Sequence, residues 1–131
     1  MRGREFLMEL RRLNEAAMAA EAQIESMRAD VERTTVRLSP APGGGSPDPA
    51  AGIIRLMQVK QRCERKIEEY NRHKARCIEL IGMIDADYQR ALTLVYINYL
   101  SKAAAAEEIG CSRTWLERRI KRGLAQLDKL I

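Results

Sequence analysis

The feature that most constrains this chain is a sustained apolar seam near its start. Apolar or small residues recur there in alternating steps of four and three, the heptad spacing of a helix that packs along its length on another helix. The seam consists of Phe6, Leu10, Leu13, Ala17, Ala20, Ile24, Met27, Val31 and, after a gap at Thr34, Leu38. Neither Gly nor Pro occurs between Gly3 and Pro40. We therefore expect one helix over residues 4–36, about 50 Å long at about 1.5 Å per residue.

A segment rich in helix-breaking residues follows. All four Pro of the chain lie at positions 40, 42, 47 and 49, and a Gly triplet occupies positions 43–45. Because Pro lacks a backbone donor and Gly disfavours helix, residues 39–52 are predicted to form a loop. At the end of this loop, Asp48-Pro49 is expected to cap the helix that follows, with Pro49 in its first turn.

A second seam occupies residues 53–84. Its members are Ile53, Leu56, Cys63, Ile67, Tyr70, Cys77, Ile81 and Ile84, and Lys60 and Lys74 stand in the two slots that break it. Two helices of similar length on either side of a loop predict a coiled-coil-like antiparallel hairpin over residues 1–84. The paired numbers should sum to roughly 87–94, which would bring Ala17 and Ala20 near Tyr70.

Composition supports an all-α fold and excludes several classes of function. Aromatic residues make up 5% and charged residues 31% of the chain, a mixture that favours helices over a β-sandwich. No apolar run reaches the length of about 18 residues that spans a membrane, and the start lacks the apolar region of a signal peptide, so we expect a cytoplasmic protein. The three Cys lack metal-ligand spacing and there is one His, so no metal, cofactor or enzymatic site is expected.

Residues 85–131 are predicted to form a helix-turn-helix domain. A helix is expected from Asp85–Tyr88 to Leu100, with Ser101 capping a short helix over Lys102–Ile109. Gly110 is expected to adopt a left-handed backbone in the turn, Cys111 to plug the turn, and Ser112 to cap a second helix. Leu116, Ile120, Leu124 and Leu127 would form the buried stripe of that helix.

The opposite face of this second helix is the candidate DNA-binding surface. An α-helix fits the major groove, where Arg pairs with guanine, Thr contacts the thymine methyl and Glu accepts from cytosine. The predicted DNA-binding residues are Ser112, Arg113, Thr114, Glu117, Arg118, Arg119, Lys121 and Arg122, of which Arg119 and Arg122 are better placed for phosphates. Trp115 lies at the border, either packed on the preceding helix or against the sugar-phosphate edge. The alternative is a capped helix pair with a solvated basic face.

The last third of the chain resembles region 4 of bacterial sigma factors. The similar stretches are Tyr88–Tyr96, Ser101, Ala106–Thr114, Arg118–Ile120 and Gly123–Ala125. The whole chain also resembles a family of small phage-encoded proteins with sigma-like C-terminal domains and a loop similar to Ser39–Ser46.

The resemblance implies a phage or prophage transcriptional regulator that acts on late-gene promoters with host RNA polymerase, in the host bacterial cytoplasm. It carries DNA contacts onto Ser112, Arg113, Thr114, Glu117, Arg118 and Lys121. No counterpart of region 2 is present, so we expect an activator or a sigma appropriator.

Two other functions remain open at this point. A phage small-terminase-like protein would pair a DNA-recognition helix with helical assembly, and a protein-binding module would use the hairpin to hold a partner. The expected partners are double-stranded DNA, host RNA polymerase and a second copy of the chain bound through the hairpin, with no membrane.

Overall fold

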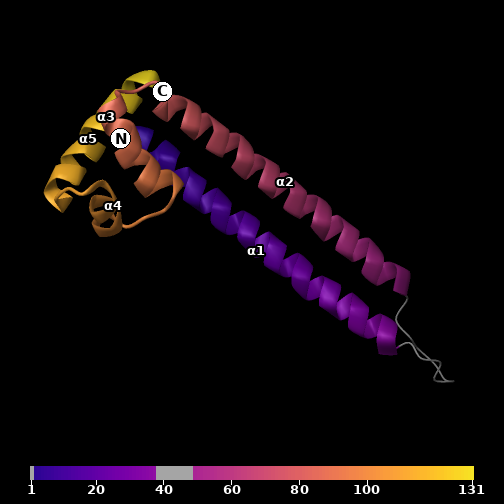
Figure 1. The fold of residues 1–131 in the computed structure, drawn as a ribbon. Helices are drawn as coiled ribbons and strands as arrows, with labels where there is room; N and C mark the ends of the chain where they lie inside the picture. Colours follow the sequence, from indigo (N-terminus) through magenta and orange to yellow (C-terminus); the bar gives the residue numbers. More distant parts are fainter. Residues whose placement is uncertain (1, 38–48) are drawn as a thin grey trace. The chain divides into compact units, whose positions relative to one another are not determined.

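The computed structural model describes residues 2–37 and 49–131, and within these ranges the regular structure is entirely helical (Figure 1). The helices are α1 (Arg2–Arg37), α2 (Pro49–Ile81), α3 (Ala86–Leu92), a π-helical turn η1 (Thr93–Ile97), α4 (Lys102–Ile109) and α5 (Arg113–Leu130). The expected all-α class is confirmed for the described part of the chain. Of the predicted loop at 39–52, residues 39–48 lie outside the described residues. Residues 49–52 are helical, because Pro49 occupies the first helical position, where a missing N–H leaves no partner unpaired.

The described chain divides into two compact units. The C-terminal unit contains the residues up to Leu13 together with Tyr70–Ile131, and the two-helix unit contains Asn14–Glu69. This division does not coincide with the predicted boundary between residues 84 and 85. The physical reason is that the start of α1 and the end of α2 belong to the same hydrophobic core as the C-terminal helices.

In the two-helix unit, α1 and α2 lie side by side and run in opposite directions (Figure 1). Ala17, Ala20 and Cys63 are buried there. A Cβ added to Gly52 would lie 3.9 Å from Cγ2 of Val31, so these two positions face each other. Their numbers sum to 83, which corrects the predicted range of 87–94.

The shifted register has a local cause. The sequence pattern placed Ile53 and Lys60 in the seam, but Ile53 is 50% exposed and Lys60 is also exposed. Gly52 and the half-buried Val59 turn towards α1 instead. A straight helix has about 3.6 residues per turn, so residues spaced seven apart gradually rotate around its axis. After several turns, a neighbouring position faces the partner helix instead.

One hydrophobic core holds the C-terminal unit together. Its buried members come from α3, η1, α4 and α5, from the ends of both long helices and from the turn after α2: Leu7, Leu10, Cys77, Leu80, Ile81, Ile84, Ala91, Leu92, Ile97, Ala105, Ala106, Leu116, Ile120, Leu124 and Leu127. Burial raises the pKa of the Cys77 thiol to about 11. Cys77 therefore acts as a small core residue and not as a nucleophile at neutral pH.

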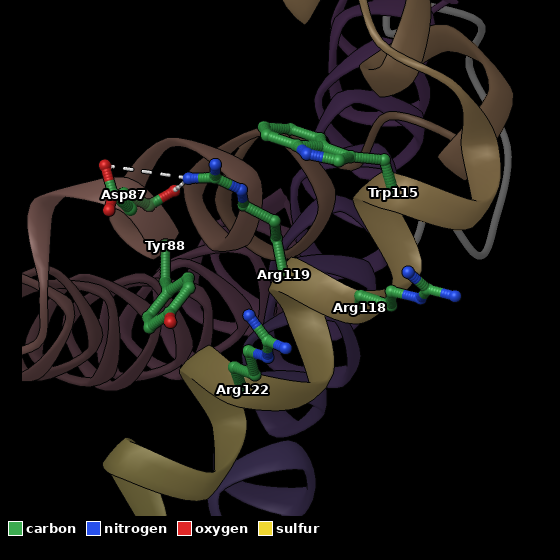
Figure 2. Close-up of a pocket in the computed structure, with 6 residues that line it drawn as sticks. All are labelled: Asp87, Tyr88, Trp115, Arg118, Arg119 and Arg122. Carbon is green, nitrogen blue, oxygen red and sulfur yellow. Dashed lines mark hydrogen bonds and ion pairs between the residues drawn. The ribbon is translucent and has the colours of Figure 1, made fainter.

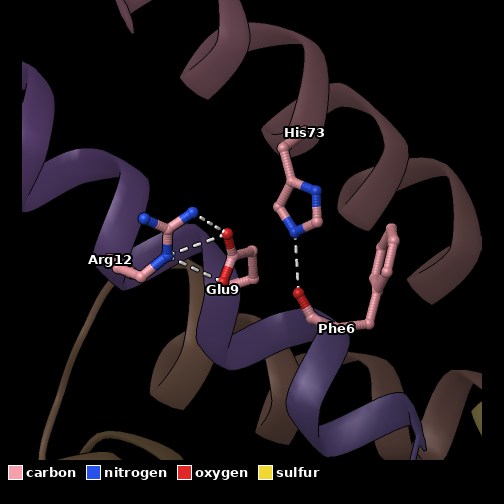
Figure 3. Close-up of polar contacts among 4 residues, drawn as sticks. All are labelled: Phe6, Glu9, Arg12 and His73. Carbon is pink, nitrogen blue, oxygen red and sulfur yellow. Dashed lines mark hydrogen bonds and ion pairs between the residues drawn. The ribbon is translucent and has the colours of Figure 1, made fainter.

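Polar contacts fix the start of α1 within this unit. The backbone N–H of Gly3 donates to the Asp128 carboxylate at 2.6 Å, which places a negative charge at the helix N-terminus. His73 Nε2 donates to the Phe6 carbonyl oxygen at 2.7 Å, and the two rings lie 4.4 Å apart (Figure 3). On the next turn, Arg12 Nε donates to both carboxylate oxygens of Glu9 at 2.9 and 3.0 Å, and this contact lowers the pKa of Glu9.

The helix predicted to run from residue 85 to Leu100 is interrupted. After α3 the chain widens into the π-helical turn, in which the Asn98 N–H donates to the Thr93 carbonyl at 2.9 Å. Tyr99 then takes a positive φ of 59°, a strained conformation for an aromatic residue. Its hydroxyl lies 3.5 Å from that of Tyr70, which helps to hold it. Residues 93–97 contain no Gly or Pro that would signal this interruption beforehand.

The turn at Gly110 gives a first testable prediction. Gly110 has φ 80° and nothing lies within 4 Å of an added Cβ, so a substitution there is strained by backbone conformation alone. We expect Gly110→Val to lower the free energy of unfolding by at least about 1 kcal/mol, measured by urea denaturation. Gly110→Asn is the matched control and should cost less, because Asn tolerates the left-handed region. Equal losses in the two variants would contradict the assigned conformation.

Two helical glycines should respond with opposite signs to the same change. A Cβ on Gly123 would lie 3.0 Å from Cβ of Tyr88 and 3.1 Å from Cδ1 of Leu92, so Gly123→Ala should destabilise the protein by about 1–3 kcal/mol. Gly52→Ala meets only an ordinary contact with Val31, so it should stabilise the protein by about 0.5–1 kcal/mol through helix propensity. Thermal and urea unfolding measure both values, and a stabilising Gly123→Ala would contradict the close approach of α5 to α3.

Candidate nucleic-acid interface

The α4–α5 turn is built by local hydrogen bonds. Gly110 adopts φ 80° and ψ 36°, and the N–H groups of Gly110 and Cys111 both donate to the Ala106 carbonyl at 2.9 Å. Cys111 is half-buried against the core. The Ser112 hydroxyl accepts from the Trp115 N–H at 3.1 Å, as the Ser101 hydroxyl does from the Ala104 N–H. The predicted left-handed glycine and both predicted serine caps are confirmed.

The buried face of α5 fixes which residues point outwards. Leu116, Ile120, Leu124 and Leu127 are buried as predicted, and Gly123 lets α5 approach α3 closely. Any rotation of α5 about its axis would expose these residues. The opposite face is therefore held towards solvent by the core.

The predicted DNA-binding residues fall on this outer face. Seven of the eight are exposed and Arg119 is intermediate. Thr114, Arg118 and Lys121 are spaced by four and three residues, so they lie along one line opposite the buried stripe. We call these three residues the central strip.

One edge of the strip is occupied by an ion-paired group. Arg113 Nε lies 3.3 Å and Lys102 Nζ 3.9 Å from Oε1 of Glu117. Glu117 thus has two basic neighbours, which already occupy the carboxylate that is predicted from the sequence to accept from cytosine. Lys102 on α4 was not among the predicted site residues. Its ion pair with Glu117 depends on how α4 packs against α5.

The other edge is an open pocket between α3 and α5. It is lined by Asp87, Tyr88, Trp115, Arg118, Arg119 and Arg122 (Figure 2). Arg119 Nη1 donates to the Asp87 carbonyl at 3.1 Å and lies 3.6 Å from its carboxylate. Arg118 and Arg122 have no ion-pair partner among the residues with described side chains. Both guanidinium groups are therefore available to an anion.

Trp115 takes a position that the sequence did not predict. The Arg119 guanidinium carbon lies 3.8 Å from the centroid of the Trp115 ring, a close cation–π contact (Figure 2). Trp115 remains 38% exposed. Asp87 and Tyr88 were also missed as pocket residues, because only the packing of α3 on α5 brings them to this helix.

Comparisons with known proteins give no relative. The chain matches no family model, and no curated protein or solved structure shows significant similarity to it. Among the helices in the described ranges, none has a segment long and apolar enough to cross a membrane.

The Arg119–Trp115 stack gives a spectroscopic prediction. Trp115 is the single Trp of the chain, so its fluorescence reports this pocket alone. Arg119→Ala removes the cation from the ring and should shift the emission to longer wavelength and increase quenching by acrylamide. The matched control, Arg118→Ala, removes a neighbouring guanidinium for which no contact with the ring is found, and should leave the emission nearly unchanged. Identical spectra for wild type and Arg119→Ala would exclude the stack.

Proposed function

We propose that this protein binds double-stranded DNA sequence-specifically through α5 and regulates transcription of a phage or prophage. In this proposal the chain consists of a helical hairpin followed by a helix-turn-helix domain similar to sigma region 4. One observation carries it: Thr114, Arg118 and Lys121 form an exposed line on a helix whose other side is buried in the core. A rigid helix with such a line suits insertion into the major groove.

The electrostatics of α5 support the same function. Residues 113–122 hold five basic side chains and one acidic one, and that acid, Glu117, is already paired with Arg113 and Lys102. The uncompensated charge lies in the central strip at Arg118 and Lys121 and beside it at Arg122, where a phosphate backbone of the groove would lie. Phosphate contacts supply much of the affinity of such proteins and orient the base contacts.

Engagement of host RNA polymerase at late-gene promoters, in the bacterial cytoplasm, is the part of the proposal that rests on the resemblance to sigma region 4. The proposed activity is binding and recruitment, and no catalytic step is assigned to the chain. A pull-down of purified host RNA polymerase by the full chain, with and without promoter DNA, tests this part separately.

Variants of α5 distinguish base recognition from phosphate binding. If Arg118 makes a bidentate base contact, Arg118→Ala should cost about 1–3 kcal/mol on the selected site and relax the preference at one base pair. Arg122→Ala should weaken all duplexes similarly and lower the salt slope by about one unit. Fluorescence anisotropy with a selected and a scrambled duplex, over a range of salt concentrations, measures both effects.

A matched control for these variants is Gln126→Ala, which lies on the same helix outside the strip. Gln126 contacts Asp85 through its side chain, so its loss changes local packing without changing the charge of the strip. It should leave DNA affinity unchanged. If Arg118→Ala also leaves both affinity and preference unchanged, α5 does not recognise DNA as proposed.

The small-terminase-like alternative keeps one specific support. The two-helix unit exposes several large apolar side chains, as an assembly surface would. Small terminase subunits form large rings, so the mass of the assembly in solution separates the two functions. A closed ring of many copies would favour the packaging role.

A further inference from the structure

The two-helix unit leaves large apolar residues in solvent. Met18 on α1 is 60% exposed, and on α2 Ile53 is 50%, Ile54 54% and Met57 58% exposed. Single exposed apolar residues are ordinary, so these four indicate a contact surface only if they share one side of the unit with complementary groups.

Helix geometry places several of these residues on one side of the unit. Ala17 faces inwards on α1 and Gly52 faces inwards on α2, so Met18 and Ile53 each lie one residue, or about 100°, further round their helices. In an antiparallel pair, equal rotations from the inward direction lead to the same side of the pair. Met18 and Ile53 therefore share that side, and Met57, one turn after Ile53, lies on it too. We call this side the exposed face.

A shallow hollow on α1 opens on the exposed face. It is lined by Met18, Glu21, Ala22, Ile24 and Glu25. Ala22 provides its low point, because its side chain is the smallest of the five. Two carboxylates, those of Glu21 and Glu25, stand one turn apart beside it. The hollow would therefore suit a long side chain that ends in a positive charge.

Lys60 on α2 is such a side chain, and it lies on the exposed face at the level of this hollow. With Gly52 level with Val31, Lys60 lies level with residue 23, between Glu21 and Glu25. The same register places Ile53 level with residue 30, next to the half-buried Ala29, and Met18 level with residue 65, two residues before the half-buried Ile67. Lys60, Ile53 and Met18 thus each have a complement near their own level on the other helix.

Within one chain these complements are not satisfied: Lys60 makes no ion pair with Glu21 or Glu25, and Met18 and Ile53 stay largely exposed. A two-fold axis parallel to the helices turns a second copy over without changing any level. In this arrangement α1 of the second copy packs antiparallel on the exposed face of α2 of the first copy. By symmetry, α1 of the first copy packs in the same way on α2 of the second copy. This is the isologous contact of a closed four-helix dimer.

We propose that the exposed face of the two-helix unit binds a second copy of the chain in this symmetric arrangement. Lys60 of each copy fills the hollow over Ala22 of the other, with its ammonium between Glu21 and Glu25. Lys60 and Glu21 have no ion-pair partner among the described side chains of their own chain. Glu25 makes only an exposed contact with Arg28 at 3.6 Å, which is readily exchanged. This proposal stands independently of DNA binding.

Analytical ultracentrifugation of the full chain tests the dimer. We expect a species of twice the 14.9 kDa chain mass. Met18→Glu should raise the dissociation constant by at least about tenfold, because two apolar contacts with Ile67 are lost per dimer. Gln23→Glu is the matched control, since Gln23 is exposed on the opposite side of α1, and it should leave the constant unchanged. Circular dichroism verifies that each variant keeps its helical content.

A charge exchange tests the register itself. Lys60→Glu should weaken the dimer, because it places a third acid between Glu21 and Glu25 at both symmetric contacts. The pair of changes Glu21→Lys and Glu25→Lys should weaken it as well, and the triple variant that combines all three should restore it.

Four results would overturn the dimer. These are a monomer at concentrations up to about 100 µM, an assembly larger than two copies, a dimer that tolerates Met18→Glu, and a triple variant as weak as Lys60→Glu alone. None of these results bears on whether α5 binds DNA, which the duplex titrations measure separately.

Discussion

The packing of both long helices into the core of the three short ones is the constraint on which the C-terminal unit depends. α3 and α4 have 7 and 8 residues, too few to bury a sufficient core with α5 alone. Leu7 and Leu10 from α1, with Cys77 and Leu80 from α2, complete that core. The proposed recognition helix α5 is therefore held by residues distant in the sequence, and a fragment beginning at residue 85 would lose part of its core.

This core also determines the chemistry of the outer face. With one side of α5 buried, Arg118 and Lys121 extend from the side of the helix that faces solvent, and the two edges of the strip differ. At one edge, Arg113 pairs with Glu117. At the other edge, Arg119 pairs with Asp87 and stacks on Trp115. Because the core already fixes the backbone of α5, a polyanion that bound the strip would have to order its exposed side chains but not the helix itself.

Local sequence signals predicted the α4–α5 turn well. The limits of α4, the left-handed Gly110 and the Ser112 cap each depend on a few adjacent residues, and all were predictable. The register of α1 against α2 was not, because Gly52 and Ile53 are both compatible with the seam and packing decides between them. The π-helical turn and the pocket between α3 and α5 were missed for the same reason: tertiary contacts, and no local motif, produce them.

Selection from a pool of random duplexes tests sequence recognition by α5 most directly. The full chain is incubated with the pool at physiological salt, and the bound duplexes are amplified and sequenced over several rounds. We expect a short shared motif to be enriched, and the wild-type chain to prefer it over scrambled duplexes by a factor within the range of about 10³–10⁷ found for specific DNA-binding proteins. Retention of duplexes without any shared motif, or no retention at low salt, would contradict recognition of a DNA sequence by α5.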